Sequence, residues 1–130
     1  MKHSAMLTIA SLLSILFLTF HLTGDIIRGF DTGGIVDLAC LPIAAVWLYG
    51  TLVLAERRSG YVIILIGSIL ALAIPFLHMG LGRGLSGPRS NSGDGAFFFI
   101  WTILALGVTA LFSVILSVRA LWSPQWGQSR

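Results

Sequence analysis

Two histidines and two aspartates stand at the edges of long apolar stretches, and they are the main candidates for chemistry in this sequence. His21 closes the first apolar stretch, and Asp25 follows four residues later, which is about one turn of a helix. Asp37 opens the second stretch and His78 closes the third. Ionisable residues at membrane depth are costly to bury and are functional candidates by default.

These four side chains can converge if the first and third stretches are helices that run in the same direction. Three interpretations follow. The two imidazoles, His21 and His78, could ligate haem b between facing helices. Alternatively, all four residues could hold a divalent transition metal, because imidazole suits zinc, copper and iron. In the third interpretation the histidines are interfacial residues that hydrogen-bond to Asp25, Asp37 or lipid headgroups.

No other group of residues predicts catalysis. Cys40 is the single cysteine, which excludes an internal disulfide and a Cys-x-x-Cys motif, and its apolar neighbours indicate a buried thiol. The glycine-rich segment 80–95 lacks the Gly-Lys-Ser/Thr ending of a phosphate-binding loop. No Ser/His/Asp or Cys/His nucleophile is evident. We therefore predict no catalytic residues and favour a role other than that of an enzyme.

The composition indicates a membrane protein. Of the 130 residues, 56% are hydrophobic and only 10% are charged, whereas soluble domains carry about 25% charged residues. A chain this short has too little interior to bury so much apolar surface, so a lipid bilayer must cover it. The net charge of +3 is spread over loops and ends without a basic patch, which excludes nucleic-acid binding.

Four apolar stretches have about the 20 residues that a membrane-crossing helix needs. They cover approximately residues 4–22, 35–55, 61–79 and 96–121. The first is longer than the apolar core of a signal peptide and lacks a cleavage site, so we expect it to be retained. The sequence thus predicts one all-α domain over residues 1–130, a polytopic antiparallel bundle of four transmembrane helices.

The loop charges predict the orientation of these helices. One side of the predicted bundle holds five of the eight basic residues and a single acid, Glu56, whereas the other side holds all four aspartates. Basic residues favour the cytoplasmic side. We therefore expect both termini on the cytoplasmic side of the membrane. The five basic residues are Lys2, Arg57, Arg58, Arg119 and Arg130.

Each predicted helix also has one face of small, weakly polar residues. Such faces let helices approach closely in lipid, and their hydroxyl groups bond across the contact. They predict either a compact bundle or contacts between copies of the chain. The faces comprise Ser4, Ser11, Ser14, His21 and Asp25; Asp37, Cys40, Ala44 and Thr51; Gly60, Gly67, Ala71, Pro75 and His78; and Thr102, Ala105, Thr109, Ser113 and Ser117.

The segments 21–29 (HLTGDIIRG) and 47–61 (WLYGTLVLAERRSGY) resemble those of small bacterial membrane proteins of uncharacterised function. The resemblance implies a four-helix integral membrane fold and transfers no activity.

We expect a non-enzymatic accessory subunit or a self-associating bundle, whose partners are the lipid bilayer and either other membrane subunits or further copies of the chain. One alternative is a redox protein that binds haem b or a metal through His21 and His78. The other is a small-solute transporter, for which the polar path would be Thr51, Ser68, Thr102, Thr109 and Ser113.

Overall fold

The structure, a computed structural model, describes residues 2–27, 38–80 and 95–123, with the backbone alone at residues 2, 3, 78–80 and 96. Four α-helices make up most of this part of the chain, and the described ranges contain no strand. The prediction of an all-helical chain with four helices is confirmed for these residues. The helices are α1 (Lys2–Ile27), α3 (Cys40–Leu52), α4 (Arg58–Gly80) and α6 (Ala96–Trp122).

The helix bounds differ from the predicted spans most clearly in α1 and α3. We expected the first helix to end near residue 22, ahead of Gly24, but α1 continues to Ile27. One glycine inside a helix costs only about 1 kcal/mol, and the extra turn brings Asp25 beside His21. The second helix is shorter than predicted and ends at Leu52. The start of its predicted span, residues 35–37, lies outside the described residues.

Three of the four helices are long and apolar enough to cross a membrane. The stretches that qualify are Ser4–Ile27, Arg58–Leu77 and Phe97–Trp122. The 13 residues of α3 would extend about 20 Å at 1.5 Å per residue, against roughly 30 Å of bilayer hydrocarbon. The helices therefore fit a membrane protein, and α3 differs from the other three in length.

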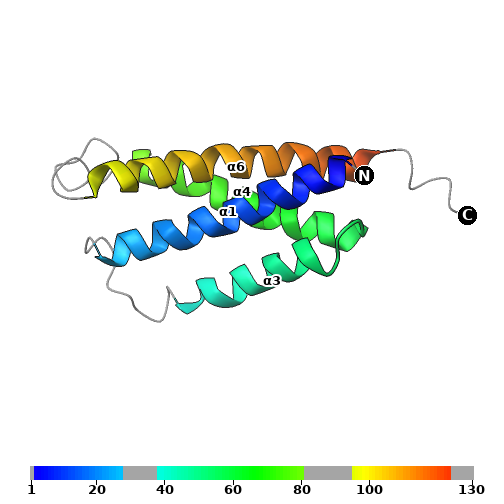
Figure 1. The fold of residues 1–130 in the computed structure, drawn as a ribbon, viewed down its shortest axis with the longest axis horizontal. Coiled ribbons are helices and arrows are strands. Elements are labelled where there is room, and N and C mark those ends of the chain that lie inside the picture. Colours follow the sequence, from blue (N-terminus) through cyan, green and yellow to red (C-terminus); the bar gives the residue numbers. More distant parts are fainter. Residues whose placement is uncertain (1, 28–37, 81–94, 124–130) are drawn as a thin grey trace, which may run out of the picture.

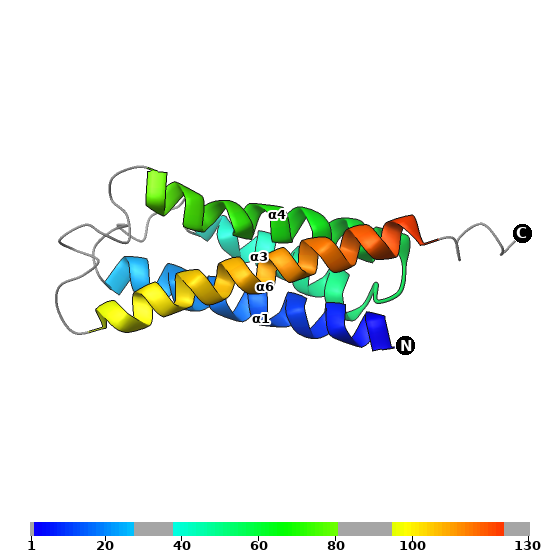
Figure 2. The same cartoon turned by 90° about the horizontal axis from the view of Figure 1, so that it is seen from above.

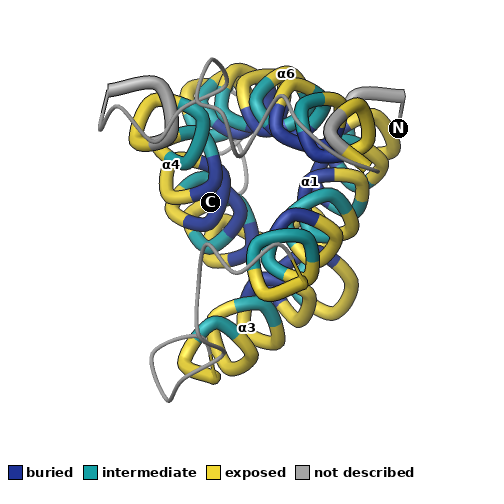
Figure 3. The backbone as a smooth tube through the Cα atoms, turned by 90° about the vertical axis from the view of Figure 1, so that its left-hand side faces the viewer, coloured by how far each residue is buried: buried dark blue, intermediate teal, exposed yellow. Residues whose placement is uncertain are grey.

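The helices lie lengthwise side by side. Figures 1 and 2 show that α1 and α4 run in one direction, while α3 and α6 run in the opposite direction. Viewed end-on, α1, α4 and α6 surround a common interior, and α3 lies outside this group against α1 and α4 (Figure 3). The start of α1, the turn between α3 and α4, and the end of α6 therefore share one end of the molecule.

The turn between α3 and α4 holds these two helices close together at that end. Leu54 and Val53 donate backbone hydrogen bonds to the Tyr49 carbonyl, and Arg57 donates one to the Leu54 carbonyl at 3.0 Å. A side chain at Gly60 would collide with the Leu54 carbonyl oxygen, and its Cβ would lie 2.9 Å from the Gly50 oxygen. Glycine at position 60 therefore permits the close approach of α4 to the end of α3.

The helix bundle is apolar on its outside as well as in its interior, unlike a soluble protein. Small hydroxyl side chains are buried between the helices, together with apolar residues such as Leu7, Trp47 and Leu106. Large apolar side chains cover the outside of every helix. Figure 3 shows the buried positions facing the interior of the α1, α4 and α6 group. The buried hydroxyl residues are Ser11, Ser14, Thr51, Ser68, Thr102, Ser113 and Ser117.

Candidate functional site

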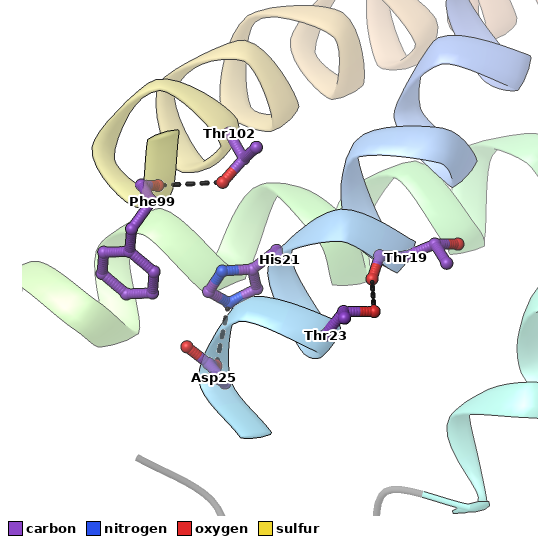
Figure 4. A network of polar contacts seen from close by, with 6 residues as sticks. All are labelled: Thr19, His21, Thr23, Asp25, Phe99 and Thr102. Carbon is purple, nitrogen blue, oxygen red and sulfur yellow. Dashed lines mark hydrogen bonds and ion pairs between the residues drawn. The ribbon is translucent and has the colours of Figure 1, made fainter. Parts of the chain in front are cut away.

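An imidazole and a carboxylate lie together in the last two turns of α1. His21 is only 1% exposed, and its Nε2 atom lies 3.3 Å from Oδ2 of Asp25 (Figure 4). Residues four apart share one face of a helix, which explains why the two side chains meet. The predicted pairing of His21 with Asp25 is therefore present, and it depends on the extension of α1 beyond residue 22.

An aromatic side chain from α6 covers this pair. The rings of Phe99 and His21 have their centroids 5.8 Å apart and are tilted by 39°. Phe99 is only 2% exposed and belongs to the interior. The neighbouring rings of Phe20 and Phe98 pack at 5.9 Å on the more exposed side. The Phe99 ring thus covers the His21 imidazole.

The electrostatic setting of this pair favours a positive charge. The carbonyl groups at a helix C-terminus carry partial negative charge, and the Asp25 carboxylate adds to it when ionised. The last turn of α1 contains no basic residue to balance them. A bound cation would do so. The arrangement is therefore suited to hold a metal ion.

The structure places only two of the four predicted site residues. Asp37 lies outside the described residues. His78 lies in the last turn of α4, which ends at the same end of the molecule as α1, but its side chain is outside the description. Among the described side chains, no three of His, Cys, Asp and Glu come together as a metal site. His21 and Asp25 are therefore the described part of the predicted site.

A second polar group, which the sequence analysis only partly anticipated, joins α1 to α3. Trp47 donates its indole N–H to the Ser11 hydroxyl at 2.9 Å, and the Ser11 and Thr51 hydroxyl oxygens lie 2.7 Å apart. Thr51 uses its own proton to bond the Trp47 carbonyl at 2.9 Å. Ser11 must therefore donate to Thr51 while it accepts from Trp47, so each of the three polar side chains is satisfied.

The Trp47 ring lies against α4 at a position that only glycine can fill. A Cβ atom on Gly67 would lie 2.5 Å from Cδ2 of the indole, well inside van der Waals contact. The sequence placed Ser11, Thr51 and Gly67 on contact faces but did not single out Trp47. The role of Trp47 could have been found from its place in the middle of an apolar stretch, because the N–H group of a buried tryptophan needs a hydrogen-bond partner. Trp47 thus connects α1, α3 and α4.

Hydroxyl groups elsewhere in the structure divide into two classes. Thr102 and Thr109 donate to carbonyl oxygens of their own helix, as do Thr19 and Thr23 on the exposed side of α1. The Ser68, Ser113 and Ser117 hydroxyls are buried and have no hydrogen-bond partner among the described residues.

Two of these three serines, Ser68 and Ser113, lie at one level of the bundle. Gly107 of α6 faces Pro75 of α4, since a Cβ there would lie 3.3 Å from Pro75 Cγ. Ser68 lies seven residues before Pro75, which is about 10 Å along α4. Ser113 lies six residues after Gly107, which is about 9 Å along α6. Because α4 and α6 run in opposite directions, both serines lie on the same side of the contact between Gly107 and Pro75. Ser68 and Ser113 thus lie at nearly the same depth in the bundle.

The Ser113 hydroxyl is expected to contribute nothing favourable to folding. A buried hydroxyl without a partner costs about 1–3 kcal/mol, so Ser113→Ala should leave stability unchanged or raise it by up to about 1 kcal/mol. Ser11→Ala should instead lower stability by about 1–2 kcal/mol, because it removes a partner of both Trp47 and Thr51. Unfolding of both variants in mixed detergent–SDS micelles, followed by circular dichroism, checks this contrast. Equal losses would contradict it.

Comparison with known protein families, with curated proteins and with solved structures finds no match for this chain. The resemblance to small bacterial membrane proteins therefore stays a prediction. A helical bundle by itself supports many activities, so only the geometry and chemistry of particular residues can indicate the function of this chain.

Proposed function

We propose that the protein is a small integral membrane protein that acts without catalysis, by associating with other membrane subunits or with further copies of itself. In this proposal α1, α4 and α6 cross the bilayer and α3 packs on their outside. The observation that carries the proposal is the outer surface of the bundle, where large apolar side chains are exposed on every helix while small hydroxyl residues are buried between the helices.

The exposed surface matches what lipid requires. Exposed apolar side chains occur along the whole length of the long helices, for example Ile9 and Leu16 on α1 and Leu104 and Ile115 on α6. Exposed threonines on α1 bond to carbonyl groups of their own helix, which satisfies them without water. In water such a surface would be far larger than the apolar patches that monomeric soluble proteins expose.

The basic residues support a cytoplasmic location for the end of the bundle at which α1 begins and α6 ends. Arg57 and Arg58 are exposed in the turn between α3 and α4, at the same end as the start of α1 and the end of α6. Lys2 and Arg119 lie at those two helix ends. Because basic residues concentrate on the cytoplasmic side, we place both termini there, in the cytoplasmic membrane of a bacterium.

The position of α3 supports a role in association. It lies outside the group of α1, α4 and α6 (Figure 3), and its outward side chains include Leu41 and Val46. Tyr49 is 52% exposed on this helix and carries a hydroxyl group that needs a partner in lipid. A neighbouring helix from another subunit or another copy would supply it, so α3 is the proposed contact.

Purification in a mild detergent followed by native mass spectrometry tests the proposal. We expect a defined oligomer or a co-purifying membrane subunit, and we expect Tyr49→Phe and Val46→Trp to weaken that association. Phe112→Ala is the matched control, since Phe112 is about as exposed as Tyr49 and Val46. Phe112 belongs to α6, and α6 lies away from α3 (Figure 3). A monomer without partners, or equal effects of all three substitutions, would contradict association through α3.

Transport of a small solute has less support than association. Of the five hydroxyl residues proposed for a polar path, Thr51, Thr102 and Thr109 donate to carbonyl groups of their own helices. Of these five residues, Ser68 and Ser113 alone have hydroxyl groups that are buried without a partner among the described residues. Two hydroxyls at one depth form a local polar spot, whereas a path would need polar groups along the length of the bundle.

A further inference from the structure

The His21–Asp25 pair has the separation of two ligands on one metal ion. In a tetrahedral site the bonds from metal to imidazole nitrogen and carboxylate oxygen are about 2.0–2.2 Å, which puts these two atoms about 3.3–3.5 Å apart. The observed Nε2 to Oδ2 distance is 3.3 Å. A charge-assisted hydrogen bond between the same groups would be shorter, at about 2.7–2.9 Å.

The position of the pair on α1 also suits chelation. Two ligands four residues apart on one helical face bind zinc in known metal motifs, because the helix fixes the distance between them. His21 is buried beneath Phe99, which restricts the imidazole to few orientations. Asp25 is 14% exposed at its side chain, so an ion can reach the carboxylate from the end of the helix.

The groups that the structure describes at the end of α1 would be stabilised by a cation. The C-terminus of α1 presents carbonyl groups with partial negative charge, and no basic residue lies in its last turn. A doubly charged ion would neutralise both the carboxylate and these carbonyl groups. An imidazole nitrogen favours zinc, copper, nickel or iron over calcium and magnesium, which prefer oxygen ligands alone.

From these observations we propose that His21 Nε2 and Asp25 Oδ2 bind a divalent transition-metal ion at the end of α1. The separation of the two atoms already matches that of two ligands on one ion. Haem would instead have to separate the imidazole from both Asp25 and Phe99. This site goes beyond the proposed association function and does not depend on α3 or on its partner.

Titration with cobalt(II) tests the site, because tetrahedral cobalt gives visible absorption bands that report its ligands. The full chain, purified in detergent without a histidine tag, should develop these bands at one ion per chain, and zinc should displace the cobalt. Asp25→Asn keeps the size of the side chain and should weaken cobalt binding at least tenfold. His21→Gln should abolish the bands.

Two matched controls separate this site from adventitious binding. Thr23→Ala removes a hydroxyl that lies between the two ligands in the sequence and donates to the Thr19 carbonyl. His3→Ala removes a histidine at the far end of α1. Both controls should bind cobalt as the parent protein does. Helical circular dichroism of each variant shows that the chain is folded. The proposal is overturned if the folded parent protein binds no cobalt, or if His21→Gln and Asp25→Asn bind it unchanged.

Discussion

Replacing Trp47 by alanine is expected to cause the largest loss of stability of any single side-chain truncation in this protein, about 3–5 kcal/mol. The indole is only 2% exposed and lies between three helices. Its removal leaves a cavity beside Gly67, and it also takes away the N–H group that bonds Ser11. Because α3 contacts α1 partly through this group, α3 should be the first helix to detach.

The matched control is Trp101→Ala, which removes the same side chain from an exposed position on α6. It should change the free energy of unfolding by less than about 1 kcal/mol, since it opens no interior cavity. Unfolding in mixed detergent–SDS micelles gives both values. A further variant, Trp47→Phe, keeps most of the ring and should lose less than Trp47→Ala. Equal losses for Trp47→Ala and Trp101→Ala would show that Trp47 is not a packing centre.

The second large effect is expected from Gly60→Ala. The added methyl group would collide with the carbonyl oxygen of Leu54 and approach that of Gly50. Both are backbone atoms, so no side-chain rotation relieves the contact and the turn itself must move. We expect a loss of about 3 kcal/mol, at the upper end of the usual cost of overpacking. The same unfolding measurement checks it.

Gly24→Ala is the control for the change of glycine to alanine in a helix. Its Cβ would meet only the Phe99 ring at 3.7 Å, an ordinary contact. Because alanine favours a helix over glycine by about 1 kcal/mol, this variant should be neutral or stabilised. Gly60→Ala as stable as Gly24→Ala would mean that α3 and α4 do not approach each other as the structure has them.

Much of the fold could be predicted from the sequence, because long apolar runs leave few alternatives. The number of helices follows from the runs and the loops between them, and the small-residue faces correctly anticipated the burial of Ser11, Gly67 and Ser113. The end of α1 was predicted too early, because Gly24 and Asp25 resemble a helix end when the gain from the His21 contact is unknown. The spacing of His21 and Asp25 shows that they can meet on one helical face, but it does not show that this contact outweighs the cost of Gly24.

The candidate site was harder to predict than the helices. The spacing of His21 and Asp25 indicated that they share a helical face, and the structure brings them together. The cover supplied by Phe99 depends on how α6 aligns with α1, which no local pattern specifies. For the same reason the role of Trp47 was missed, since its partners Ser11 and Gly67 lie far away in the sequence.

Quenching of tryptophan fluorescence by lipids brominated in their acyl chains tests most directly whether the bundle turns its apolar surface to the bilayer. Two variants are needed, one that keeps only Trp101 and one that keeps only Trp47, with phenylalanine at the other three of the four tryptophan positions. In vesicles of brominated lipid, the exposed Trp101 should be strongly quenched and the buried Trp47 much less. Quenching of neither residue, or stronger quenching of Trp47 than of Trp101, would contradict the account.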